Sequence, residues 1–439
     1  MAIKTNPLST VFSIVFLFQL TMSSCSSDDP GPENITPLKS IFTLTIKNGG
    51  ISLPAGATEW IIASDVSGKL LDYEKLETTG KFNLAAPESF DEEKIRISFL
   101  RIVEGTDTYQ YYLRSYNHIG VNSSWNFVAS QMPATDPELP FKVNISHYPK
   151  TASHNISISQ RGGEITSFTT QRDQEVLSLD FHLFKSSKDL IISLTQPGSE
   201  PLFYKIDSPS GETIDLDFAA DFKSFDNAFN VPLPGNNSYL ASIRGVDDLN
   251  DEVIEAFSGN SFVTTSGGGA DNFVTLGYLD GYNYYYSLLL GTKNSTPFNQ
   301  SFHYEKMGAK PTFEDFQIPD SKVAISNFSI DNFQASLLTE FQYYGITWAL
   351  SLAKPGISHE FIVRNYGPAD AEFVGVIELP ETITEMYVDL GRIFEAEFLS
   401  GTFTKRLDGK GFGDYIGEQF GHENYTKLEK ELYSYTLSK

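Results

Sequence analysis

The sequence predicts an all-β protein made of two or three antiparallel β-sandwich modules, Ig-like or jelly-roll-like, arranged in tandem. Apolar and polar residues alternate with a period of two in many short segments, which is typical of strands that bury one face. Turn dipeptides such as Ser67-Gly68, Pro197-Gly198 and Asp280-Gly281 separate these segments at short intervals. Long helical patterns do not alternate with the strands, so a parallel α/β sheet is not predicted.

The first 24 residues have the composition of a secretory signal peptide. Lys4 supplies a positive charge, and an apolar stretch runs from position 11 to position 20. This stretch is too short for a membrane-spanning helix, which needs roughly 20 apolar residues. We therefore expect residues 1–24 to be a signal peptide that is removed on export.

Cys25, the single cysteine of the chain, follows this segment directly. Met22-Ser23-Ser24-Cys25 resembles the lipobox of bacterial lipoproteins, with Met22 in place of the more usual Leu. The Ser- and Asp-rich stretch that follows is similar to that of surface-exported lipoproteins of the Bacteroidota. The resemblance implies that Cys25 becomes the first mature residue, carries acyl chains and holds the protein on the outer membrane, facing the exterior. The alternative is an ordinary secretory signal that leaves a free thiol.

The prolines and turn signals divide the rest of the chain into a spacer and three modules. A linker rich in proline, at 130–140, separates the first module from the second, and a second break falls at 308–319. The expected parts are a flexible spacer at 25–39, a β-sandwich module at 40–130, a larger β-rich module at 141–310 and a C-terminal β-rich module at 311–439.

Individual strands and helices follow from the residue patterns. Within the first module, Ser64-Asp65-Val66-Ser67-Gly68-Lys69 forms a turn between two predicted strands. This Asp-x-x-Gly hairpin, within 42–85, resembles the opening of a carboxypeptidase-regulatory-like β-sandwich module, and the similarity covers about one hairpin. Two short helices are predicted, at 247–257 and 424–432. The clearest strands are predicted at 95–99, 177–183, 190–194, 344–352, 394–398 and 433–437.

The charge of the chain limits its partners. It contains 56 acidic and 32 basic residues, with a formal net charge of −24. A surface this acidic repels nucleic acid and anionic lipid headgroups, so neither is an expected partner. The expected partners are the membrane, through the lipid anchor, and a glycan or protein ligand.

Motifs for catalysis and metal binding are weak. The chain has no Gly-x-Ser-x-Gly motif and no thiol other than Cys25, so no catalytic, metal or cofactor residue is assigned. His147 and His154 flank a predicted hairpin and could converge on a metal ion. Histidines at such positions are more often solvated strand residues. Calcium is the cofactor that would best suit two acidic clusters, 247–252 and Asp215 with Asp217 and Asp221. An acidic surface loop or the start of a helix is the favoured explanation of both clusters.

Aromatic residues offer candidate glycan platforms, because Tyr and Trp combine an apolar ring with a polar edge. Packing within a sheet is the alternative role for each of them. The candidates are Tyr109, Tyr111, Tyr112, Trp125, Tyr282, Tyr284, Tyr285 and Tyr286.

The sequence therefore predicts a lipid-anchored cell-surface protein with a non-catalytic role in binding or in a surface complex, with glycan as the favoured ligand class. Two alternatives stay open. One is an extracellular glycan hydrolase with an unidentified Asp/Glu pair. The other is a structural stalk or accessory subunit of an outer-membrane system.

Overall fold

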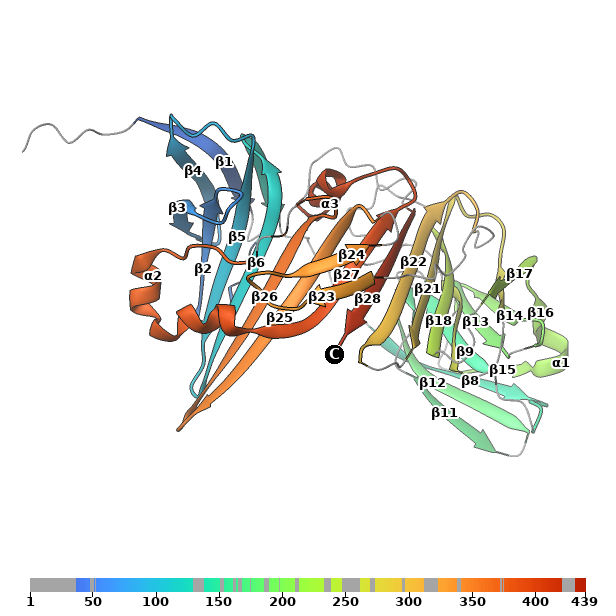
Figure 1. The fold of residues 1–439 in the computed structure, drawn as a ribbon. Coiled ribbons are helices and arrows are strands. Elements are labelled where there is room, and N and C mark those ends of the chain that lie inside the picture. Colours follow the sequence, from blue (N-terminus) through green and yellow to red (C-terminus); the bar gives the residue numbers. More distant parts are fainter. Residues whose placement is uncertain are drawn as a thin grey trace, which may run out of the picture. The chain divides into compact units, whose positions relative to one another are not determined.

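A computed structural model gives the fold of the chain (Figure 1). From Leu38 onward the described residues belong to one compact unit. The described residues are 37–47, 51, 53–128, 138–150, 154–160, 163–164, 168–173, 175–184, 189–196, 198–209, 213–232, 238–246, 261–268, 273–293, 297–311, 323–337, 341–371, 373, 375–420 and 431–439.

A mixed sheet of twelve strands is the largest element of the fold. All its strand pairs are antiparallel except one, between β26 and β6. In spatial order the strands are β19 (Ser261–Gly268), β18 (Ser238–Val246), β21 (Tyr284–Lys293), β22 (Asn299–Gly308), β28 (Glu431–Ser438), β27 (Glu397–Arg406), β25 (Tyr343–Lys354), β26 (Ile357–Pro368), β6 (Thr108–Gly120), β5 (Lys94–Glu104), β2 (Ala57–Ser64) and β3 (Leu70–Lys75).

The smaller sheets complete an all-β, multi-sheet fold, as predicted. Two of them contain a parallel pair, β1 with β7 and β8 with β15. One sheet is β4 (Gly80–Pro87), β1 (Leu38–Lys47) and β7 (Ser123–Val128); a second is β10 (Gly163–Glu164), β9 (Asn155–Gln160), β13 (Asp189–Thr195), β14 (Leu202–Asp207) and β16 (Lys223–Ser224); a third is β11 (Phe168–Asp173), β12 (Val176–Phe184), β8 (Glu138–Ser146) and β15 (Thr213–Asp217); the pairs are β17 (Asn227–Pro232) with β20 (Phe273–Tyr278) and β23 (Val323–Asn327) with β24 (Gln334–Leu337).

The twelve-stranded sheet draws strands from all three segments that the sequence analysis treats as modules. β2, β3, β5 and β6 come from 40–130, four further strands come from 141–310, and β25 to β28 come from 311–439. The parallel contact between β6 and β26 joins the first of these segments to the last. The three segments therefore share one continuous sheet.

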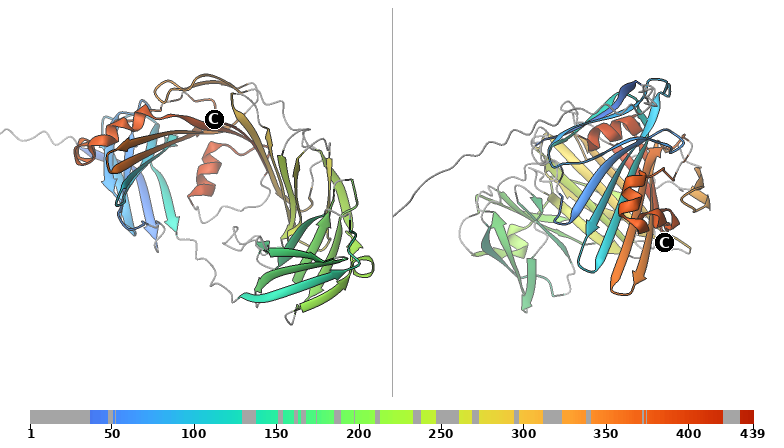
Figure 2. Two further views of the ribbon diagram at one scale, coloured as in Figure 1. Left: turned by 90° about the horizontal axis from the view of Figure 1, so that it is seen from below. Right: turned by 90° about the vertical axis from the view of Figure 1, so that its left-hand side faces the viewer.

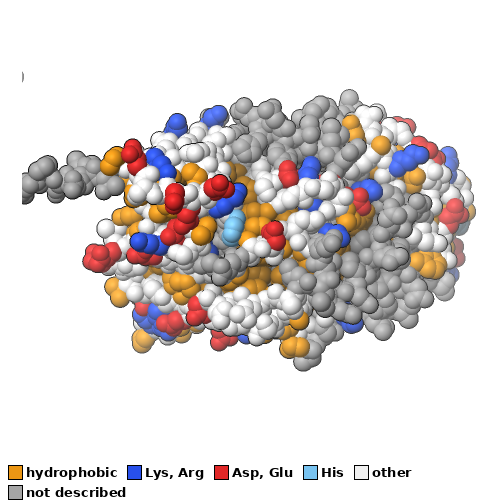
Figure 3. Space-filling view, turned by 45° about the horizontal axis from the view of Figure 1, so that its top comes forward, with side chains coloured by type: hydrophobic (Ala, Val, Ile, Leu, Met, Phe, Trp, Pro, Cys, Tyr) orange, Lys and Arg blue, Asp and Glu red, His pale blue; other side chains and the backbone are white. Residues whose placement is uncertain are grey.

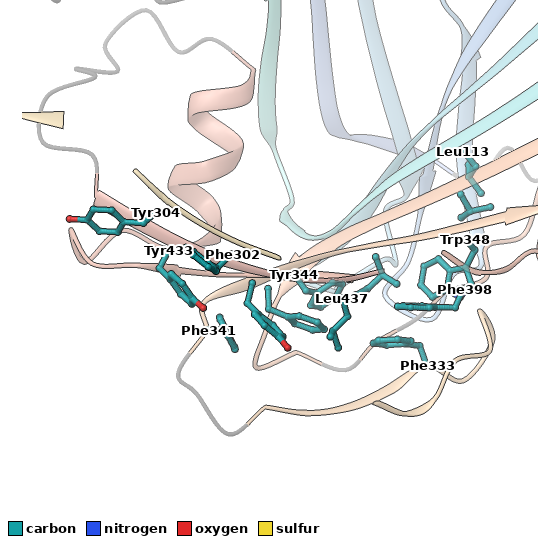
Figure 4. Close-up of a cluster of buried hydrophobic side chains, with 14 of the residues drawn as sticks. Leu113, Phe302, Tyr304, Phe333, Phe341, Tyr344, Trp348, Phe398, Tyr433 and Leu437 are labelled. Atoms are coloured by element: carbon teal, nitrogen blue, oxygen red, sulfur yellow. The ribbon is translucent and has the colours of Figure 1, made fainter. Parts of the chain in front are cut away.

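The apolar face of this sheet carries the largest core. Trp348, Phe398 and Phe333 lie together in it, and the ring of Phe333 stacks on Phe398 with centroids 6.2 Å apart (Figure 4). The segment around β23 and β24 covers this face, as do the helix α2 (Glu381–Met386) and the 3₁₀-helix η1 (Val388–Glu395). Burial of this size is the main stabilising term of the fold.

The opposite face is concave, and α3 (Phe412–Gln419) lies on it (Figure 2). A second core forms where β1, β4, β7 and α3 cover part of this face; its members include Phe42, Trp125, Tyr116 and Ile416. A third core fills the space between the four- and five-stranded sheets, at whose edge the short helix α1 (Phe218–Asp221) follows β15.

Most predicted strands are confirmed, whereas the helices are not. β5, β12, β13, β25 and β28 cover the predicted strands. Burial alternates as predicted in β12 and in the first half of β25, whereas β5 and β13 are buried on both faces. The strand predicted at 394–398 is wrong in its first half, because Phe394 and Glu395 end η1 and β27 begins at Glu397. A helix that the sequence analysis does not predict, α3, begins directly after Gly411. The helix predicted at 247–257 lies outside the described residues, and of the one at 424–432 only the last two residues are described, as the start of β28.

Candidate functional site: an arginine-lined groove

A groove lies on the concave face of the twelve-stranded sheet, where β5, β6 and β26 extend beyond the three-stranded sheet that covers their other ends. Its volume is about 770 Å³. The lining residues are Ile51, Pro54, Glu59, Phe99, Arg101, Val103, Gln110, Tyr112, Leu113, Arg114, Phe127, Ile362, Arg364 and Phe420.

Strand register brings three arginines to this groove. Arg114 on β6 is paired directly with Arg364 on β26. In the next row along the strands, Arg101 on β5 is paired with Tyr112 on β6. Because residues paired across neighbouring strands project from the same face, the three guanidinium groups share one surface.

One of the three arginines is neutralised by its neighbour. Arg101 donates from Nε and Nη2 to Oε2 of Glu59, at 3.1 and 2.7 Å. The carboxylate of Glu59 is 9% exposed, so this is a largely desolvated ion pair. Such a pair holds Arg101 in place and leaves little net charge at this end of the groove.

Arg114 and Arg364 differ from Arg101 in their partners. Both are exposed, and among the described residues neither forms an ion pair with an acidic side chain. Burial works against the charge of Arg114, but a hydrogen bond with Tyr116, the nearby Tyr366 and the charge of Glu59 outweigh it and raise the pKa of Arg114. Two like charges directly opposite each other destabilise a sheet. An anion bound between the two guanidinium groups would remove this repulsion.

The rest of the floor supplies neutral hydrogen-bonding groups. Gln110 donates from Nε2 to Oε2 of Glu360 at 2.8 Å, across β6 and β26. Tyr112 is half-buried between Arg101 and Ile362.

Figure 3 shows another feature of the surface: acidic and basic side chains are interspersed around hydrophobic ones on the face drawn there. Against such mixed charge, two adjacent arginines that form no ion pair with any described acidic side chain are a distinctive feature.

Aromatic side chains form the wall between the groove and the second core. Phe127 stacks on Phe99 and on Phe420, with ring centroids 5.5 and 5.3 Å apart. Trp125 stacks on Phe420 at 4.1 Å. Phe420 follows α3 directly, so the position of this helix determines the shape of the wall.

A buried arginine fixes α3 to the sheet. The side chain of Arg406, at the end of β27, is 0% exposed. It donates to Asp408 and to both carboxylate oxygens of Glu418 on α3, the latter at 2.8 and 2.9 Å. This cluster of Arg406, Asp408 and Glu418 is called the α3 clamp below.

The aromatic residues predicted as glycan platforms have different environments. Trp125 is 2% exposed and Tyr111 is also buried, so neither can serve as an exposed platform. Tyr109 stacks on the buried His359 at 5.5 Å on the opposite face of the sheet. Of Tyr109, Tyr111 and Tyr112, only Tyr112 lines the groove. Among the four candidate tyrosines at 282–286, Tyr285 is buried. The other three, Tyr282, Tyr284 and Tyr286, are half-buried.

The residues considered as possible metal ligands have local hydrogen-bond partners. Asp217 is the N-cap residue of α1. Its Oδ2 atom lies 2.5 Å from Nδ1 of His147, and this hydrogen bond raises the pKa of His147. Asp215 accepts from Asn144, and His154 contacts the hydroxyl of Tyr148. No group of three or more His, Cys, Asp or Glu side chains suited to a metal ion occurs in the described part of the chain. The cluster at 247–252 lies outside the described residues.

The lipid-attachment residue Cys25 also lies outside the described residues. Within the described residues, no helix has the length and apolar character needed to cross a bilayer.

Arg101, Arg114 and Arg364 were not singled out from the sequence. A signal for them exists, because each occupies a polar position in an alternating strand of a strongly acidic chain. The pairing of β6 with β26, which brings Arg364 next to Arg114, could not be inferred from that alternation.

No protein-family model, curated protein or solved structure matches this chain significantly. The functional argument therefore depends on the geometry of the groove.

Proposed function

We propose that this protein is a lipid-anchored cell-surface protein that binds an anionic ligand in the arginine-lined groove, without cleaving it. The observation that carries the proposal is the direct pairing of Arg114 with Arg364, both exposed and without an acidic partner among the described residues. Guanidinium groups form strong, often bidentate hydrogen bonds with carboxylate, sulfate and phosphate groups. Within a chain of net charge −24, such a pair provides a local site that attracts anions.

An acidic saccharide is the ligand class that the lining favours. The aromatic wall and Tyr112 offer apolar ring surfaces beside the charged groups. A pocket with apolar walls and a few placed polar groups is typical of small-ligand and saccharide sites. This agrees with the glycan class expected from the sequence.

Glu59, which lines the groove, and Glu360, which lies beside it, favour binding over hydrolysis. A glycosidase needs one carboxylic acid that can donate its proton and a second carboxylate across the scissile bond. Glu59 accepts two hydrogen bonds from Arg101, and Glu360 accepts one from Gln110. Both carboxylates are therefore occupied by neighbouring side chains of the sheet.

The test of binding is a titration of the purified full-length protein with carboxylated and sulfated oligosaccharides and with neutral oligosaccharides of equal length. We expect the charged ligands alone to bind. We expect Arg364→Met to weaken binding about tenfold to a hundredfold, because hydrogen bonds to charged groups contribute about 1.5–3 kcal/mol. Added salt should weaken the binding further.

The matched control is Arg392→Met, which removes an exposed arginine of η1 that pairs with Glu395. It should bind like the unchanged protein. Equal loss in both variants, or tighter binding of the neutral ligand, would contradict the proposed role of the groove.

The proposed anchor is tested by replacing Cys25 with Ala. We expect this variant to leave the membrane fraction, because two or more acyl chains are needed for stable attachment. Mass spectrometry of the unchanged protein should show a lipid-modified residue 25 at the mature N-terminus. A variant that stays with the membrane would contradict the anchor and leave the binding proposal unaffected.

A further inference from the structure

A row of small hydroxyl side chains continues from the arginine pair across the concave face of the twelve-stranded sheet. Arg364 is paired with Thr347 on β25, Thr347 with Ser400 on β27, and Ser400 with Ser438 on β28. Ser438 is paired in turn with Asn299 on β22. Because each pair projects from the same face, these side chains form one line, which we call the hydroxyl row.

The hydroxyl row is accessible and low. Thr347, Ser400 and Ser438 are half-buried, and Asn299 is exposed. The side chains of the row are short, and the exposed Leu399, the bulged residue of β27, flanks it at Ser400. A ligand that leaves the groove past Arg364 can therefore lie along the row.

The parallel line beside it is also polar. Thr402 on β27 and Thr436 on β28 are paired, and their hydroxyl oxygens are 2.8 Å apart. Gly345 occupies this line on β25, and a side chain there would meet the ring of Tyr366 at 2.9 Å. The ring of Tyr366 therefore covers Gly345 on this line, while the hydroxyls of Thr402 and Thr436 can accept and donate hydrogen bonds beside the hydroxyl row.

The length of the row points to an extended ligand. Neighbouring strands are about 4.8 Å apart, so Arg114 and Asn299, five strand spacings apart, are separated by roughly 24 Å along the sheet. A single sugar unit cannot contact both ends. A chain of several units can place acidic groups on Arg114 and Arg364 and hydroxyl groups on the row.

We propose that the ligand is an acidic polysaccharide, carrying carboxylate or sulfate groups, that runs from the arginine pair along the hydroxyl row towards β22. This inference rests on the proposed function of the groove and adds the length and path of the ligand. Charge complementarity selects an anionic polymer, and neutral hydroxyls along the remaining path match the hydroxyls of sugars.

The test measures affinity against ligand length in the full-length protein. Uronic acid oligomers and sulfated oligomers are titrated from the monosaccharide to the hexamer. We expect affinity to rise with length. We expect Ser400→Trp, which places a large ring on the row, to weaken hexamer binding about tenfold and to leave monosaccharide binding unchanged.

The control is Ser336→Trp, at an exposed position of β24, on the segment that covers the opposite, apolar face. It should not change binding of either length. Equal affinity for monosaccharide and hexamer, with no effect of Ser400→Trp on the hexamer, would overturn the extended path. In that case loss of binding in Arg364→Met would still support the groove itself.

Two other outcomes also contradict the inference. Tighter binding of an acidic peptide than of an oligosaccharide with the same charge would assign the site to a protein partner. Absence of binding to every acidic oligomer would overturn both the extended path and the proposed function.

Discussion

The α3 clamp and the arginine pair of the groove lie on the same face of one sheet, yet they use arginine in opposite ways. Arg406 is completely buried and is neutralised by Asp408 and Glu418. Arg114 and Arg364 are exposed and face each other without an acidic partner among the described residues. The difference arises from what covers each arginine. α3 brings Glu418 to Arg406, whereas no acidic side chain from the described residues reaches Arg364 as an ion-pair partner.

This comparison separates arginines that hold the fold from arginines that are available to a ligand. A buried arginine that loses its partners becomes costly, because an uncompensated charge remains in a desolvated site. An exposed arginine without a partner contributes little to stability. The two regions should therefore respond differently to the same substitution.

The largest expected effect is the loss of stability when Arg406 is replaced by Met. We expect the free energy of unfolding to fall by about 3 kcal/mol, because Asp408 and Glu418 are left without their cationic partner. The equivalent change in the groove, Arg364→Met, should alter it by no more than about 0.5 kcal/mol. Urea unfolding followed by tryptophan fluorescence measures both values.

A triple variant sharpens this result. Replacing Arg406, Asp408 and Glu418 together by Met, Leu and Leu removes every charge of the clamp, and most of the lost stability should return. If Arg364→Met destabilised the protein as much as Arg406→Met, the distinction between the two arginine sites would be wrong.

A smaller effect is expected from pH. Burial disfavours the charged form of Asp408, but hydrogen bonds from Arg406 and from the backbone of Lys410 outweigh it and hold the pKa of Asp408 below its ordinary value of 3.8. A carboxyl group with a lowered pKa in the folded state stabilises the fold above its unfolded pKa, and this contribution disappears as the pH falls through the folded pKa. Stability should thus decrease below about pH 4.

The variant Asp408→Asn isolates this contribution from those of other carboxylates. Its stability should be lower at neutral pH and should fall less steeply below about pH 4. Unfolding curves at several pH values, compared with those of Asp331→Asn, provide the measurement. Asp331 also has a lowered pKa, but its partner is the nearby Ser329 and not α3. Parallel curves for the unchanged protein and Asp408→Asn would mean that Asp408 does not carry this pH dependence.

The strands of this fold follow from local sequence, whereas its helices and its sheet order do not. The alternation of Ile346 and Trp348 with Thr347 is a local pattern, and it predicts β25 together with its buried face. The helix α3 begins directly after Gly411 and contains two further glycines, which weaken its local signal. Packing of Phe412 and Ile416 in the second core and the clamp on Glu418 supply the stabilisation that local preference lacks.

The groove was missed for a related reason. Aromatic clusters in the sequence indicate Tyr112 as a ligand platform, but they indicate Trp125 as well. Trp125 is instead buried against Phe420, a contact across nearly 300 positions of the chain. Pairing between distant strands determines which polar residues meet, and residue alternation contains no information on that pairing.

The contact of β6 with β26 also has a consequence for biosynthesis. Gln110 and Glu360 are bonded across these strands although they are 250 positions apart. Chains are made from the N-terminus, so β6 is complete long before β26 has been synthesised. During that interval its hydrogen-bonding edge is open to wrong partners, and sheets that close through such distant contacts fold slowly. A product truncated before β26 would lack Arg364, so the pair that Arg364 forms with Arg114 could not form.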